Sequence, residues 1–289
     1  MIPQMIYHSD DYGISEYSCQ QILNCCDHGK LQSVAILPNS SYFDTAVQTL
    51  RPYVVSGKLA ITVHLNLVEG PSITPIGHLP HLTDEKGYFK LSFGQLLLQT
   101  MLSPRGPLVQ EIRTELKNQI LKIRNSFPDT PIGLDSHQHF HMIPAVFRTV
   151  VELIPEAELT LTHLRFADEP LLPFLKEPSL YASYRPINLI KNLTLKVLGW
   201  KDRTYLKGTD YNIPLFFGLM LSGHMDRQRV EKLLPHFCNI AANKKCSLEI
   251  LSHPGGIRSI DECMDPNKKG FVEFYLSEGR SQEAHMLFE

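Results

Sequence analysis

Short apolar runs alternate with helical patterns along most of this chain, and this alternation restricts the fold more than any other feature. The runs predict strands at residues 4–9, 31–38, 59–67, 133–139, 160–166, 213–220 and 247–253. Between residues 109 and 127, Ile112, Leu116, Ile120 and Ile123 recur at the spacing of one buried helix face. Strands that alternate with helices predict βα units and a parallel sheet, and about seven units predict barrel-like closure.

The sequence contains no internal repeat and no low-complexity linker, so we expect a single α/β domain over residues 1–289. Two segments, at about residues 68–90 and 167–212, are long and contain Pro, Gly and aromatic residues. We expect them to overhang the carboxyl-terminal rim of the strands as substrate-binding loops. Their aromatic side chains suit stacking on sugar rings, although packing within the loops explains them equally well.

The run DSHQHFHM at residues 135–142 places ionisable side chains at every second position, namely Asp135, His137, His139 and His141. A strand points alternate side chains to one face, so these four are expected to line up together. At ~3.3 Å per residue, His137 and His141 would lie about 13 Å apart, so all three imidazoles cannot bind one ion. The pattern indicates a metal site whose other ligands come from elsewhere in the chain.

Polar residues also follow other predicted strands. Asp10 and Asp11 come after the first strand, His64 lies late in the third, and His253 closes the seventh. Carboxyl ends of parallel strands meet at one rim, so these side chains are expected to converge there. Asp and neutral His are ligands of catalytic divalent ions. Taken singly, an adjacent pair of Asp residues is more often solvated, and a lone strand His is more often a core residue.

The composition is that of an ordinary soluble globular enzyme, with 43% hydrophobic and 20% charged residues. A formal charge of −2 predicts neither nucleic-acid nor membrane partners. The six Cys form no CxxC pair, which is typical of reduced thiols in a cytoplasmic protein. No run of about 18 apolar residues and no signal-peptide pattern occurs, so we expect a soluble, cytoplasmic protein.

The assembled motifs resemble the YdjC-like carbohydrate deacetylases, the family of the chitooligosaccharide deacetylases. The resemblance extends over nearly the whole chain and is carried by SDDYG, TVHLNLVEGPSI, LTDEKGYF, DSHQHFHMIP, LRF and SHPGG. It implies an irregular (β/α) barrel related to NodB-type polysaccharide deacetylases, and hydrolysis of an N-acetyl group on an amino sugar or chitooligosaccharide. The expected partner is therefore an N-acetylated carbohydrate, and the expected cofactor is one divalent metal ion, Mg²⁺ or Zn²⁺.

Position by position, the resemblance implies metal ligands at Asp11, His64 and His137, a general base at Asp10 and a general acid at His253. The chain departs from the family at Ser9 and Tyr12, which replace Ala and Phe beside the two carboxylates. Family members also tend to continue past the helix matched by residues 280–287. This second departure leaves barrel closure and a homo-oligomer as open expectations.

Other polar residues are expected to support this site. We expect Asp135 and His139 to orient the imidazoles that bind the metal, and His141 either to support the site or to lie at the surface. Arg165 either holds Asp10 through a charge-assisted pair or forms a surface ion pair.

Two alternatives stay open at this point: another metal-dependent enzyme, such as a phosphoesterase or sugar isomerase, and a non-catalytic carbohydrate-binding protein. The absence of a Gly-rich turn or an Arg/Lys cluster disfavours phosphate chemistry. The presence of both Asp10 and His253 disfavours a site without catalysis.

Overall fold

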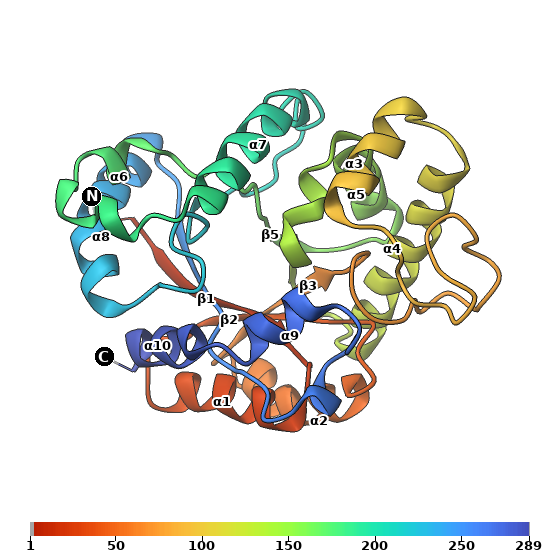
Figure 1. Cartoon of the computed structure of the whole chain (residues 1–289), viewed down its shortest axis with the longest axis horizontal. Coiled ribbons are helices and arrows are strands. Elements are labelled where there is room, and N and C mark those ends of the chain that lie inside the picture. The colour runs from red at the N-terminus through yellow and green to blue at the C-terminus, as the bar shows by residue number, and fades with distance from the viewer. Residues whose placement is uncertain (1–2, 289) are drawn as a thin grey trace.

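A computed structural model describes residues 3–288 and shows a curled sheet of seven parallel strands with helices packed against it (Figure 1). The strand order is β5-β4-β3-β2-β1-β7-β6. This confirms the predicted α/β class and the predicted set of strands. The strands are β1 (Met5–Tyr12), β2 (Ser33–Ile36), β3 (Ala60–Leu65), β4 (Ile132–Ser136), β5 (Leu161–Leu164), β6 (Leu215–Phe217) and β7 (Leu248–Ser252).

Helices connect the strands and cover the sheet (Figure 1). The α-helices are α1 (Glu16–Asp27), α2 (Phe43–Val55), α3 (Phe93–Leu102), α4 (Pro107–Ser126), α5 (Pro144–Glu156), α6 (Leu172–Leu175), α7 (Pro186–Asp202), α8 (Arg227–Lys244), α9 (Lys269–Tyr275) and α10 (Glu278–Leu287). Short 3₁₀ segments are η1 (His137–Met142), η2 (Pro178–Ser183) and η3 (Ile260–Glu262).

Helix α4 shows how the predicted periodicity becomes packing. It begins with Pro107, whose missing N–H has no partner to lose in the first turn. Its apolar face, including Ile112, Leu116 and Ile120, is fully buried, and each such side chain contributes roughly 1.5–3 kcal/mol of transfer free energy. On the same helix Glu115 is buried and accepts hydrogen bonds from the backbone N–H groups of residues 73 and 74 at 3.0 and 2.9 Å. The helix therefore also anchors the loop that follows β3.

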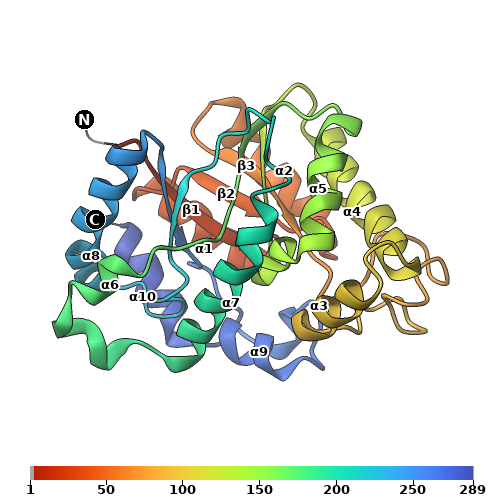
Figure 2. The ribbon, with the colours of Figure 1, turned by 90° about the horizontal axis from the view of Figure 1, so that it is seen from above.

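The sheet curls without closing its hydrogen-bond ladder. Strands β5 and β6 form its two edges and do not pair with each other within the described chain. Between them, the Leu164 N–H donates to the Asn212 carbonyl at 3.0 Å, so the segment before β6 bridges part of the opening. Seen from above, α7 and α9 lie toward the same side of the molecule (Figure 2), whereas Figure 1 shows them well separated. Both helices contribute side chains to the same cavity.

Two local predictions are wrong. The fourth strand ends at Ser136, and His137–Met142 forms a 3₁₀ segment in which Gln138 and His139 have left-handed φ values of 54° and 55°. The alternation of side chains therefore stops before His137, and the four ionisable residues of this run do not share a strand face. Asp10 and Asp11 lie inside β1 rather than after it.

Residues 3–288 include no helix that combines the length and the apolar character needed to cross a membrane.

Candidate metal and hydrolytic site

A bulge in β1 turns two adjacent carboxylates toward one cavity. The pairing with β2 shifts register between Ser9 and Tyr12, and Asp11 has a left-handed φ of 65°. In a regular strand Asp10 and Asp11 would point to opposite faces. The bulge re-aims one of them, so both line the same cavity. A left-handed conformation at a residue with a Cβ is strained, and such strain is characteristic of functional sites.

Arg165, just after β5, forms a bidentate ion pair with Asp10. It donates to the two Asp10 oxygens at 2.9 and 2.8 Å, and it also reaches Asp135 and Glu249. The side chain of Arg165 is fully buried, so the pair is not a surface salt bridge. Burial alone would raise the pKa of Asp10, but Arg165 and then His64 outweigh burial and hold this pKa well below its usual range. Asp10 is therefore an ionised, fixed carboxylate.

Three side chains from different strand ends meet beside Asp10. Ligand atoms of Asp11, His64 and His137 all lie within 4.8 Å of one another. Asp11 Oδ1 is 3.4 Å from His64 Nε2 and 3.0 Å from His137 Nδ1. On its other side, His64 donates from Nδ1 to Asp135 at 2.7 Å, which fixes the ring with Nε2 directed at Asp11. The structure thus brings together the three residues that the resemblance implies as metal ligands.

The electrostatics of this cluster demand positive charge. Burial opposes protonation of His64, yet Asp10 and Asp135 raise its pKa to about 10. Burial also opposes protonation of His137, and Asp11 and then Glu69 raise its pKa to about 9. The Nε2 atoms of both rings are buried and lack a hydrogen-bond partner among the described residues. Carboxylates and imidazoles in this arrangement fit a divalent cation, whose charge would take the place of the two protons.

The C-terminal helices add residues that the sequence reasoning missed. Arg280 of α10 donates to Asp11 Oδ2 at 2.5 Å and also to the carbonyl of Gly255, whose φ of 137° suits glycine. Tyr275 donates to Glu69 at 2.6 Å, and Glu69 lies 3.2 Å from His137 Nε2. Arg280 and Glu69 are buried. Asp11 is therefore held from the opposite end of the chain.

His253, one residue after β7, faces Asp10 across the cavity. Its Nδ1 lies 3.2 Å from Glu283, which also accepts the His253 backbone N–H at 2.5 Å. Its Nε2 lies 3.9 Å from Asp10 Oδ2. Glu283 was also missed from the sequence, although Arg280 and Glu283 stand one turn apart on α10, the spacing of a shared helix face.

The two remaining histidines of the run have different surroundings. His141 is fully buried, with Nε2 donating to the Arg165 carbonyl at 3.0 Å and Nδ1 lying 2.6 Å from the Ser136 hydroxyl. Burial lowers its pKa to about 4, so His141 is neutral. Its two hydrogen bonds connect Ser136 at the end of β4 with Arg165 after β5. His139 packs edge-on against Phe216 and lines the cavity. Within the described part of the chain, His139 forms no hydrogen bond with His64 or His137, whereas Asp135 is hydrogen-bonded to His64.

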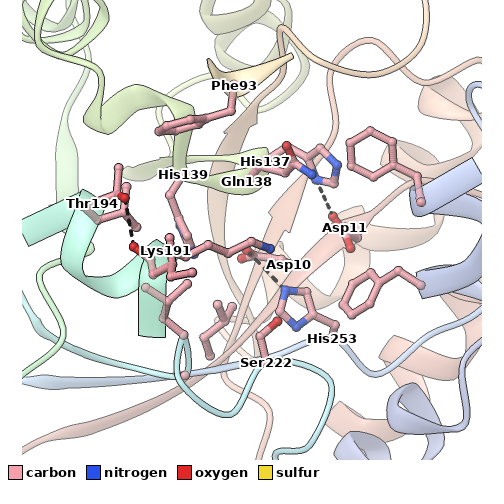
Figure 3. Close-up of a pocket in the computed structure, with 18 residues that line it drawn as sticks. Asp10, Asp11, Phe93, His137, Gln138, His139, Lys191, Thr194, Ser222 and His253 are labelled. Carbon is pink, nitrogen blue, oxygen red and sulfur yellow. Dashed lines mark hydrogen bonds and ion pairs between the residues drawn. The ribbon is translucent and has the colours of Figure 1, made fainter. Parts of the chain in front are cut away.

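The cavity beside these groups has a volume of about 390 Å³, within the usual size of small-molecule sites. Figure 3 shows Asp10, Asp11, His137 and His253 along one side and Phe93, His139 and Thr194 around the rest. Phe271 and Phe274 of α9 and apolar residues of α7 complete the wall. A largely apolar cavity with a few convergent polar groups is the usual form of a ligand site.

A curled parallel α/β sheet with its ionisable groups gathered at the carboxyl ends of the strands defines the class of barrel-type α/β enzymes. The family model described as YdjC-like protein matches residues 4–288, so the chain belongs to the YdjC-like family. This is a carbohydrate-processing enzyme family.

One solved structure shares the fold. A protein of Enterococcus faecalis described as a "putative cellobiose-phosphate cleavage protein" is 22% identical, with a TM-score of 0.68, covering 100% of this chain and 92% of that one. A β-mannanase from Thermomonospora fusca is 11% identical with a TM-score of 0.38, covering 100% of this chain and 94% of that one. The first of these supports the predicted barrel-type fold.

Proposed function

We propose that this protein is a metal-dependent hydrolase that removes N-acetyl groups from amino sugars or chitooligosaccharides. One observation carries the proposal: the three-ligand cluster of Asp11, His64 and His137 lies next to a facing pair, Asp10 and His253, in one cavity. Family membership supports a carbohydrate as the substrate. Metal-assisted amide hydrolysis uses this combination of an electrophilic centre, a base and an acid.

Asp11, His64 and His137 would hold the ion, through one carboxylate and two imidazoles. When bound there, Mg²⁺ or Zn²⁺ supplies Lewis acidity toward a carbonyl oxygen and toward water. Asp135 keeps the His64 ring in the orientation that leaves Nε2 free, and Arg280 keeps Asp11 in place. This donor set is compatible with either metal, because imidazole favours Zn²⁺ while an open site with water ligands also accepts Mg²⁺.

The remaining residues move protons. Asp10, held ionised by Arg165, accepts a proton from the water whose oxygen attacks the acetyl carbon. When the C–N bond breaks, the nitrogen must gain a proton, because an amide anion is a very poor leaving group. His253 Nε2 faces the cavity while Glu283 engages Nδ1, so His253 is oriented to donate that proton. The products are acetate and the free amino sugar.

The cavity wall suits a sugar ring. Phe93, Phe271 and Phe274 provide aromatic faces, and Gln138 and Ser222 provide polar groups beside them. Aromatic rings pack on the apolar faces of sugars while polar groups at the edge bind hydroxyls.

The test is acetate release from a panel of N-acetylated mono- and oligosaccharides by protein loaded with Mg²⁺ or Zn²⁺, with mass spectrometry of the sugars. We expect a mass loss of one acetyl group with glycosidic bonds intact. Asp210→Asn, at an exposed position, serves as the matched control for Asp10→Asn. Shortened sugars that keep their acetyl groups would identify a glycosidase instead, and released phosphate or an isomerised sugar would identify the alternative metal enzymes.

A further inference from the structure

Helix α7 presents an apolar face to solvent. Its buried side is mixed: Asn188, Asn192 and Asp202 lie there beside Leu195, Leu198 and Gly199. Its solvent side is apolar, with exposures between 40% and 82%. A surface helix normally buries its apolar stripe and exposes its charges. An exposed apolar face of this kind indicates an interaction surface. The exposed apolar residues are Ile187, Leu189, Ile190, Leu193, Val197 and Trp200.

Trp200 is the only tryptophan of the chain and is 82% exposed. Helix α3 adds a second apolar group, Leu98, Met101 and Leu102, exposed by 60%, 64% and 77%. Figure 1 shows α3 and α7 along the same edge of the molecule, opposite α2. Phe93 at the start of α3 and Ile190 of α7 both line the cavity, so this edge adjoins the candidate site.

The residues in and around α7 are mainly basic. Residues 185–207 contain one acidic residue, the buried Asp202, and six basic ones, Arg185, Lys191, Lys196, Lys201, Arg203 and Lys207. Lys196 and Arg203 pair with Asp168. Arg185, Lys201 and Lys207 are exposed and form no ion pair with any described residue. The net charge of −2 for the whole chain conceals this local excess of positive charge.

We propose that the apolar face of α7, with its flanking basic residues, binds the surface of an anionic lipid bilayer. An apolar stripe with Trp and Leu, bordered by Lys and Arg, is the pattern of a helix that lies in the membrane interface. Basic side chains are attracted to the negative surface of such a bilayer. A second copy of the chain fits less well, because its α7 would bring the same positive charges against these.

Vesicle sedimentation tests this proposal with the full-length protein. We expect binding to vesicles of phosphatidylcholine mixed with phosphatidylglycerol, weaker binding to phosphatidylcholine alone, and loss of binding as salt increases. Trp200 reports the contact directly, because its fluorescence should shift to shorter wavelength on entering the interface. Lys201→Glu exchanges one positive for one negative charge and should weaken binding about 30-fold.

Val197→Glu should abolish vesicle binding, whereas the matched control Val55→Glu, 81% exposed on α2, should bind like the unchanged protein. Neither residue lines the cavity, so deacetylation of a soluble substrate should be unchanged in both variants. Equal loss of binding in the two variants would overturn the proposal, as would failure to bind anionic vesicles. A Trp200 shift that depends on protein concentration without lipid, with doubled mass in sedimentation, would show instead that α7 pairs two copies.

Discussion

Replacing Arg165 by methionine should destabilise the protein strongly, and by an amount that depends on pH. The methionine keeps an apolar stem near the Phe216 ring, over which the guanidinium now lies at 5.4 Å. Among residues 3–288, it removes the one side chain whose cation pairs with Asp10, Asp135 and Glu249 together. Removing one partner of a buried ion pair costs about 3–5 kcal/mol of unfolding free energy. Arg165 pairs with three carboxylates, so we expect this variant to lose about 5 kcal/mol or more. That is a large share of a typical unfolding free energy of about 5–15 kcal/mol.

The pH dependence follows from the direction of the pKa shifts. In the unchanged protein, burial is outweighed by Arg165 and the pKa values of Asp10 and Asp135 are lowered. Their contribution to stability is therefore present above the unfolded pKa and is lost only as pH falls through the lowered folded value. Without Arg165, the largest opposing contribution to burial is lost and only the nearby histidines, chiefly His64, still favour the charged carboxylates, so these pKa values rise. The penalty then exists above the raised values and shrinks as pH falls.

Urea unfolding of both proteins at pH 7 and pH 5, in chelator so that bound metal does not contribute, measures the difference. We expect the loss in unfolding free energy to be larger at pH 7. Arg124→Met is the control, because its pair with Glu158 is exposed and worth at most about 1 kcal/mol. A loss below about 1 kcal/mol for Arg165→Met, or the same loss at both pH values, would refute the reasoning.

Three further predictions concern the site. His137→Ala should lose most divalent metal after identical loading, as measured by elemental analysis; equal metal in both proteins would remove His137 from the ligand set. Asp10→Asn should keep the metal but release acetate roughly 10²–10⁴-fold more slowly, the range for a lost general base. Glu283→Gln and His253→Ala should slow amide hydrolysis more than hydrolysis of an aryl acetate ester, whose leaving group needs no proton; an equal effect on both substrates assigns them a structural role.

The sequence predicted the strands well because each is a short apolar run bounded by polar residues, and burial in a parallel sheet requires such runs. It also placed Asp10, His64 and His253 near strand ends, where the topology gathers them. The run from residue 135 to 142 led to a wrong prediction of strand structure. Its alternation of ionisable residues does not show where the strand ends and the 3₁₀ segment begins. Only the backbone shows that Gln138 and His139 are left-handed.

Residues that act on others were harder to predict. Arg280 and Glu283 carry no motif of their own, and nothing in their spacing relates them to Asp11 or His253. Their roles arise from tertiary packing of α10 beside β1 and β7, which local patterns do not encode. Glu69 lies inside the motif TVHLNLVEGPSI, but its contacts with Tyr275 and His137 depend on the path of the loop after β3.

The contact between Asp11 and Arg280 joins positions 269 residues apart. During synthesis, strands β1 to β7 all emerge before Arg280 of α10, whose guanidinium neutralises Asp11. A ribosome-bound chain that lacks α10 would hold its strained β1 carboxylate without that partner and its His253 without Glu283. Assembly of the site therefore depends on α10. A chain cut short before residue 280 would keep most of its core and lack an assembled site.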